Sequence, residues 1–120
     1  MVTDLWDKHG KPLAYVDDDR ESIYLFDGTP VAWLFQSAIY SYGGRLLGWM
    51  EQGWVFGRDG KCLLFTAQAH SKPSRPFRQE AGARSERGLR PSRAPRDTLV
   101  KRPERTQVWA TGDPMRFFVR

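Results

Sequence analysis

The sequence has little of what most catalytic, metal-binding or membrane proteins use. Cys62 is its single cysteine and it has two histidines, so an intramolecular disulfide is excluded and a zinc site built from cysteine ligands is not expected. No apolar run approaches the roughly 20 residues of a membrane-spanning helix, and the first residues lack the basic and apolar segments of a signal peptide. We therefore expect a cytoplasmic protein without a membrane span, metal ion or cofactor.

Catalytic motifs are also missing. His9 and His70 stand outside any motif that would make them a base or a ligand, and there is no glycine-rich nucleotide-binding loop. The acidic triplet at 17–19 lacks the central glycine and closing glutamate of an EF-hand calcium loop. Asp27 and Asp59 stand where tight turns favour aspartate. We predict that the protein is not an enzyme and has no catalytic residues.

The sequence does contain one short motif that is repeated four times between Leu5 and Phe65. Each copy has a central glycine, and these glycines are 18, 16 and 16 residues apart (Gly10, Gly28, Gly44 and Gly60). Four columns recur around the glycine: an aliphatic residue five before it (Leu5, Ile23, Ile39, Val55), an aromatic residue four before it (Trp6, Tyr24, Tyr40, Phe56), an aliphatic residue three after it (Leu13, Val31, Leu47, Leu63) and an aromatic residue five after it (Tyr15, Trp33, Trp49, Phe65). Chance does not produce four such columns, so the repeat is real.

Each copy predicts a β-hairpin. Its turn dipeptide is His-Gly, Asp-Gly or Gly-Gly, and the last two tolerate the positive φ angles of tight hairpin turns. The position four after the glycine is small in three copies and Leu64 in the fourth, which indicates close packing near a symmetry axis. A lone hairpin cannot bury its apolar face, so the copies should close on one another. We predict an all-β fold of four tandem hairpin repeats in a pseudo-four-fold, flower-like arrangement over residues 1–70.

This repeated motif resembles the repeats of the bacterial four-fold β-flower family. The resemblance covers residues 5–69, and its most specific part is Ile39-Tyr40-Ser41-Tyr42-Gly43-Gly44-Arg45-Leu46-Leu47-Gly48-Trp49-Met50-Glu51. It implies four hairpins around a central axis, and it brings no activity or catalytic residues.

Charge divides the chain. Residues 1–70 hold 6 Lys/Arg and 9 Asp/Glu, whereas residues 71–120 hold 13 and 5. Between 71 and 107 the basic residues recur at multiples of three (Lys72, Arg75, Arg78, Arg84, Arg87, Arg90, Arg93, Arg96, Arg102 and Arg105). Polyproline II has three residues per turn, so in that conformation these side chains share one face. With few apolar side chains, we expect this segment to be a disordered, basic tail when free.

The tail has three interpretations. It is a solvated spacer, a binder of a polyanion such as nucleic acid or an anionic lipid surface, or a linear motif for the groove of a protein partner. Residues 108–120 are apolar again, and Trp109, Phe117 and Phe118 either dock on the repeat domain or form a short motif for another protein. Lys11, Arg45 and Lys61 each follow a turn glycine, so they form a candidate anion-binding ring near the axis. We expect the aromatic columns to be buried rather than exposed for base stacking.

These observations favour a non-catalytic interaction or adaptor module with an unidentified protein partner. The alternative is polyanion binding through the basic tail.

Overall fold

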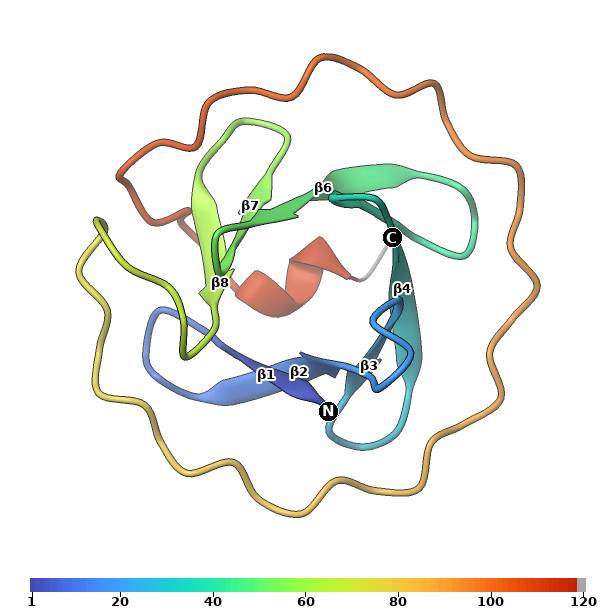
Figure 1. Cartoon of the computed structure of the whole chain (residues 1–120), viewed down its shortest axis with the longest axis horizontal. Helices are drawn as coiled ribbons and strands as arrows, with labels where there is room; N and C mark the ends of the chain where they lie inside the picture. Colours follow the sequence, from blue (N-terminus) through green and yellow to red (C-terminus); the bar gives the residue numbers. More distant parts are fainter. Residues whose placement is uncertain (119–120) are drawn as a thin grey trace.

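Eight short antiparallel strands form a closed barrel in the computed structural model, which describes residues 1–118 (Figure 1). The elements are β1 (Thr3–Trp6), β2 (Pro12–Val16), β3 (Ser22–Leu25), β4 (Pro30–Phe35), β5 (Ala38–Tyr40), β6 (Leu46–Glu51), β7 (Trp54–Gly57), β8 (Cys62–Phe65) and the 3₁₀ helix η1 (Pro114–Phe117). Each copy of the repeat forms one hairpin, and neighbouring hairpins pair around the ring. The prediction of an all-β fold with four hairpin repeats is confirmed.

The four hairpin turns share one geometry. In the first, the Gly10 amide donates to the Asp7 carbonyl and the Asp7 amide donates to the Lys11 carbonyl, at 2.9 Å each, and the other three copies repeat this pattern. Each turn glycine has a φ between 79° and 93°. A residue in this left-handed conformation closes a three-residue hairpin loop. The glycine alone carries the positive φ, whereas the residue before it does not.

A β-bulge recurs in every hairpin. In the first, Leu5 is paired with Ala14 but Trp6 with Pro12, so Leu13 is the extra residue. The other three hairpins shift register at the equivalent point, which makes the third residue after each glycine the bulged one. Because a bulge bends its strand and increases the local twist, it curves each two-stranded unit toward closure. The repeat pattern in the sequence did not predict this bulge.

The barrel has two buried faces. Alternation along the strands sends the aliphatic column and the small residues inward, into a cluster that includes Leu5, Ala14, Ile23 and Ile39. The aromatic columns point outward and form a second cluster with Trp6, Trp33, Trp49, Phe56 and others. The aromatic columns are buried, as expected, but on the outside of the barrel.

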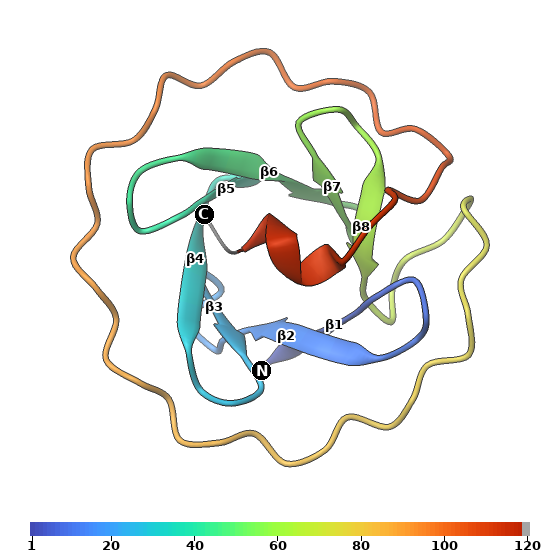
Figure 2. The ribbon, with the colours of Figure 1, turned by 180° about the vertical axis from the view of Figure 1, so that it is seen from behind.

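The tail covers this outer face. Residues 71–107, here called the belt, run once around the barrel in an extended course that passes the hairpins in chain order (Figures 1 and 2). No helix or strand forms in the belt, but the segment follows a defined course against the barrel, which the expectation of a disordered tail did not include. The Cα radius of gyration of 13.4 Å is near the roughly 13.6 Å expected for a compact domain of this length.

After the belt the chain turns inward. Trp109 forms an isolated parallel bridge with Cys62, and η1 lies at the centre of the barrel (Figures 1 and 2). Phe117 and Phe118 are buried in the inner cluster. Of the two arrangements proposed for the C-terminus, the structure shows the docked one; positions 119 and 120 of the predicted segment 108–120 lie outside the described residues.

Candidate functional site

The belt is attached at four equivalent places, here called stations, one on each hairpin turn. The carbonyl of each turn glycine accepts a hydrogen bond from a belt amide: Gly10 from Gln79, Gly28 from Gly88, Gly44 from Asp97 and Gly60 from Thr106, at 2.7–2.8 Å. A Cβ on Gly10, Gly28 or Gly44 would collide with the belt carbonyl of Phe77, Glu86 or Pro95, respectively. The glycine column therefore both turns the hairpin and lets the belt approach.

Arginines of the belt contact the barrel, although most of them also remain exposed to solvent. Five of them form ion pairs with its carboxylates: Arg84 with Asp4 (2.5 Å), Arg87 with Asp17 (2.8 Å), Arg90 with Asp19 (3.0 Å), Arg93 with Glu21 (2.6 Å), and Arg102 with Glu51. Five of the nine acidic residues in the first 70 positions are thus paired with belt arginines, so the two oppositely charged parts of the sequence partly compensate each other.

The belt arginines also stack on the outer aromatic rings. Arg78 lies 5.1 Å from the centroid of the Trp6 ring, Arg93 lies 4.1 Å from that of Trp33, and Arg96 lies 3.5 Å from that of Phe35. Arg75 and Arg105 both lie over Trp54, at 5.9 and 5.0 Å. A guanidinium over an aromatic face contributes about 0.5–1 kcal/mol at exposed sites. Of the ten candidate polyanion-binding residues, nine therefore contact the barrel through their side chains.

The two ends of the belt meet at one point. The Arg105 guanidinium donates to the Lys72 carbonyl at 2.6 Å, and the Trp109 indole donates to the Ser74 carbonyl at 3.0 Å. This junction lies against Trp54 and Phe65, whose rings pack on Trp109. The strand pair beneath it, β1 with β8, is joined in register by one residue pair, Trp6 with Phe65. The belt thus closes over the least extensive strand pairing of the barrel.

Asp19 and Cys62 are among the titratable groups near the belt that have shifted pKa values. Burial alone would raise the pKa of Asp19, but hydrogen bonds from Ser22 and Glu21 and the charge of Arg90 outweigh it, so the pKa is lowered. Burial raises the pKa of the Cys62 thiol, and the adjacent Arg105 opposes this shift in part. A buried thiol with a raised pKa is a poor nucleophile, which fits a packing role.

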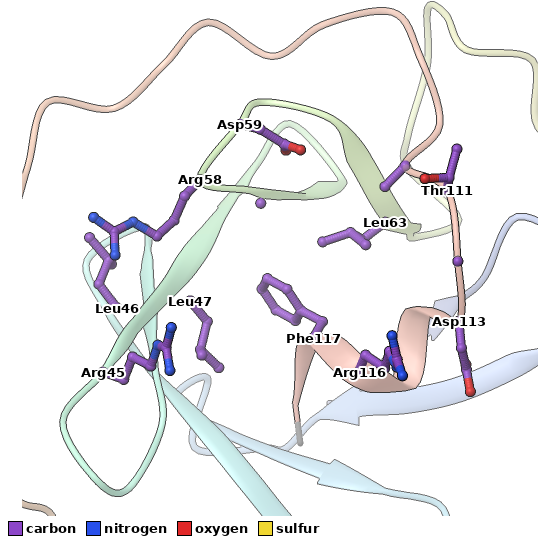
Figure 3. Close-up of a pocket in the computed structure, with 13 residues that line it drawn as sticks. Arg45, Leu46, Leu47, Arg58, Asp59, Leu63, Thr111, Asp113, Arg116 and Phe117 are labelled. Atoms are coloured by element: carbon purple, nitrogen blue, oxygen red, sulfur yellow. The ribbon is translucent and has the colours of Figure 1, made fainter. Parts of the chain in front are cut away.

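A depression with a volume of about 380 Å³ opens between the last two hairpins and the C-terminal segment (Figure 3). Its apolar lining comes from Leu47, Leu63 and Phe117, and three exposed arginines surround it: Arg45, Arg58 and Arg116. Asp59 and Asp113 also line it, and both are engaged by backbone amides, of Lys61 and Met115 respectively. We call this site the mouth pocket. It offers guanidinium groups beside an apolar surface.

The three cations expected in an axial ring are not brought together on the axis. Lys11, Arg45 and Lys61 are exposed and follow the turn glycines of separate hairpins, beside the belt. The centre is occupied by η1 instead (Figure 1). Of the three, Arg45 lines the mouth pocket. Its neighbours Arg58 and Arg116 were missed because they lie far apart in the sequence and outside the repeated columns.

Within residues 1–118, no group of three or more His, Cys, Asp or Glu side chains is placed to hold a metal ion. The same residues include no helix that is long and apolar enough to cross a membrane.

Comparisons with known proteins support the architecture. A search of curated proteins and a search of solved structures gave no match. The model of a family described as 4-fold beta flower protein matches residues 3–118. This match continues past the barrel through the belt to η1, further than the stretch on which the resemblance of the sequence rested. Because it covers nearly the whole chain, the protein belongs to the 4-fold beta flower protein family.

Proposed function

We propose that this protein is a non-catalytic interaction module that binds an acidic segment of a protein partner in the mouth pocket. The observation that carries the proposal is that Arg45, Arg58 and Arg116 line one pocket together with the apolar residues Leu47, Leu63 and Phe117 (Figure 3). No ion pair joins these arginines to a carboxylate within residues 1–118, in contrast to the arginines of the belt.

The chemistry of the pocket selects the class of ligand. A guanidinium group presents planar donors that match a carboxylate, and an aliphatic side chain next to that carboxylate would pack on Phe117 and Leu63. Asp59 and Asp113 at the rim would repel a ligand with several adjacent negative charges. A segment in which acidic and aliphatic residues alternate therefore fits better than a uniform polyanion.

The scaffold suits a binding role. Phe117 is 5 % exposed and Leu47 is 5 % exposed, so the floor of the pocket is fixed by the packing of the barrel and η1. A preformed pocket loses little conformational entropy on binding. The arginines are exposed and supply the adjustable contacts.

The test is fluorescence anisotropy of a labelled peptide of alternating Glu and Leu, titrated with the full chain and with Arg45→Ala, Arg58→Ala and Arg116→Ala. We expect each substitution to weaken binding by about tenfold, since a hydrogen bond to a charged group contributes about 1.5–3 kcal/mol. Lys11→Ala is the matched control, because Lys11 occupies the position of Arg45 on the first hairpin. Equal affinity in all four variants would rule out the mouth pocket as the binding site.

Polyanion binding through the belt is the second candidate. Arg75, Arg78, Arg96 and Arg105 stack on aromatic rings without a carboxylate partner among the ion pairs described, so the belt keeps some uncompensated charge. A labelled single-stranded oligonucleotide in a salt series distinguishes the two candidates. Binding that falls steeply with salt and is unchanged by Arg58→Ala would favour the belt over the pocket.

A further inference from the structure

We propose that the outer face of the barrel is a four-station recognition track for extended segments with a nine-residue arginine repeat. In this structure the chain's own belt fills the track, and we infer that the same segment of a second copy can fill it in its place. This inference is independent of the mouth pocket.

The spacing of the contacts is the first observation. The amides that bind the four turn glycines belong to residues 79, 88, 97 and 106, and the carbonyls closest to those glycines belong to residues 77, 86, 95 and 104. Both series advance by nine. Two further amides, of Ser85 and Ala94, donate to the Phe26 and Tyr42 carbonyls, again nine residues apart. Residues 71–106 of the belt therefore form four units of nine residues: 71–79, 80–88, 89–97 and 98–106.

The number nine follows from the size of the barrel. The molecule measures 36 by 36 Å across the plane of the ring, and a circle of that diameter has a quarter circumference of about 28 Å. Nine residues at the polyproline II rise of roughly 3.1 Å also span about 28 Å. One unit thus reaches from one station to the next, and a unit of eight or ten would lose register progressively around the ring.

Aligning the four units shows which side chains the track selects. The fifth position is arginine in every unit (Arg75, Arg84, Arg93, Arg102), and so is the eighth (Arg78, Arg87, Arg96, Arg105). The second position varies (Lys72, Ala81, Arg90, Leu99), as do most of the others. The two constant columns supply every belt arginine that stacks on an aromatic ring. They also supply four of the five arginines that pair with barrel carboxylates, and the fifth, Arg90, stands at the second position.

The track recognises backbone and arginine, neither of which depends on the belt being in the same chain. The belt joins the barrel through the exposed turn at Ala67 and Gln68, and at its other end it continues into Trp109 and η1, which pack on the barrel. Between these ends it is held mainly by hydrogen bonds, ion pairs and ring stacking. Covalent attachment raises the local concentration of the belt without adding contacts. A belt from a second copy would meet the same four glycines and rings, which makes exchange between copies the expected mode of partnering.

The experiment uses the full chain with a specific protease site inserted between Ala67 and Gln68. After cleavage we expect the belt to stay bound and the two pieces to elute together in gel filtration at low salt. A labelled peptide of residues 68–120, added in excess, should then replace the original belt and elute with the barrel. Separation of the pieces after cleavage, or retention without any uptake of the peptide, would overturn the proposal.

Two peptide variants test the specificity of the track. A peptide with lysine at all eight constant positions keeps the charge but loses planar stacking, and we expect it to compete at least about tenfold more weakly. A peptide with one alanine inserted after each unit keeps every arginine but has a period of ten, and we expect no capture. Capture of the period-ten peptide as strong as that of the natural peptide would show that the spacing of the units is not recognised, and would refute the nine-residue register.

Discussion

The barrel and the belt are each built from four repeated units, but the interactions that give each its shape differ. Each barrel repeat of 16–18 residues forms a hairpin with its own hydrogen bonds and buries side chains on both faces. Each belt unit of nine residues has no strand or helix, and its amides bond to the barrel instead. The barrel can specify its shape through packing, whereas the belt acquires its shape from the surface that it contacts.

This difference explains how much sequence each region needs. A hairpin that closes a ring must supply inward aliphatic residues, outward rings, a turn glycine and a bulge, so many positions of its repeat are constrained. A belt unit must supply two arginines and a backbone amide at the correct spacing. The remaining seven positions of each unit vary, and the belt resembles a disordered tail when its sequence is considered alone.

The largest expected effect is the loss of a ring that serves both regions. Trp54 is fully buried, packs on Phe65 and Trp109, and lies under Arg75 and Arg105. We expect Trp54→Ala to lower the free energy of unfolding by about 3–5 kcal/mol, measured by urea denaturation. Phe77→Ala is the control, because the Phe77 side chain is 93 % exposed. Equal stability of the two variants would contradict the role given to Trp54.

A smaller loss of stability is expected from alanine substitutions that distinguish the cost of a left-handed backbone from the contact between the turn and the belt. Gly28 and Gly112 both have positive φ, 93° and 87°, but a Cβ on Gly28 would meet the belt whereas one on Gly112 meets open space. We expect Gly112→Ala to cost about 1–2 kcal/mol for the left-handed backbone alone, and Gly28→Ala to cost clearly more. Thermal denaturation measures both. If the two costs are the same, the belt does not press on the turn.

Substitution of a single belt arginine should lower the stability of the protein less than the changes above. Arg93 pairs with Glu21 and stacks on Trp33 but is partly exposed, so we expect Arg93→Ala to cost about 1 kcal/mol. Hydrogen exchange of the neighbouring amides of Ala94 and Asp97 should become faster. Lys101→Ala is the control, because Lys101 lies outside the three-residue register. Free exchange of both amides in the unsubstituted protein would show that the belt is not held at this station.

Acid should produce the smallest change. The pKa of Asp19 is lowered in the folded protein, so its contribution is present above its unfolded pKa of about 3.9 and is lost as the pH falls through the folded value. We expect the melting temperature to fall less steeply below about pH 4 in Asp19→Asn than in the unsubstituted chain. Parallel profiles would show that Asp19 does not couple folding to protonation.

Much of the barrel could be predicted from the sequence because its determinants are local. Gly10 and Gly28 mark turns, and the residues on either side alternate or recur in fixed columns, so the hairpins and their number follow directly. The bulge at Leu13 was not predicted, since it depends on which residues pair across the hairpin. The outward direction of Trp6 was not predicted either, because alternation shows that two faces differ but not which one faces the axis.

Less of the candidate site could be predicted from the sequence. The arginines of the belt were identified with the correct period of three, but their targets, such as Asp4 and Glu21, lie about 70–80 residues away in sequence. The larger period of nine is set by the circumference of a ring that does not exist until the barrel closes. Likewise Arg45, Arg58 and Arg116 surround one pocket only because β6, the turn after β7 and η1 meet there.

The sequence by itself determined four hairpins, their turns, the burial of the aromatic columns and an extended basic segment, because each of these depends on residues close together in the chain. The tertiary structure alone decided that the basic segment encircles the barrel, that its arginines contact the barrel and that the C-terminal helix fills the centre. The physical reason is that these outcomes depend on the diameter and charge of a closed surface, which distant residues create together.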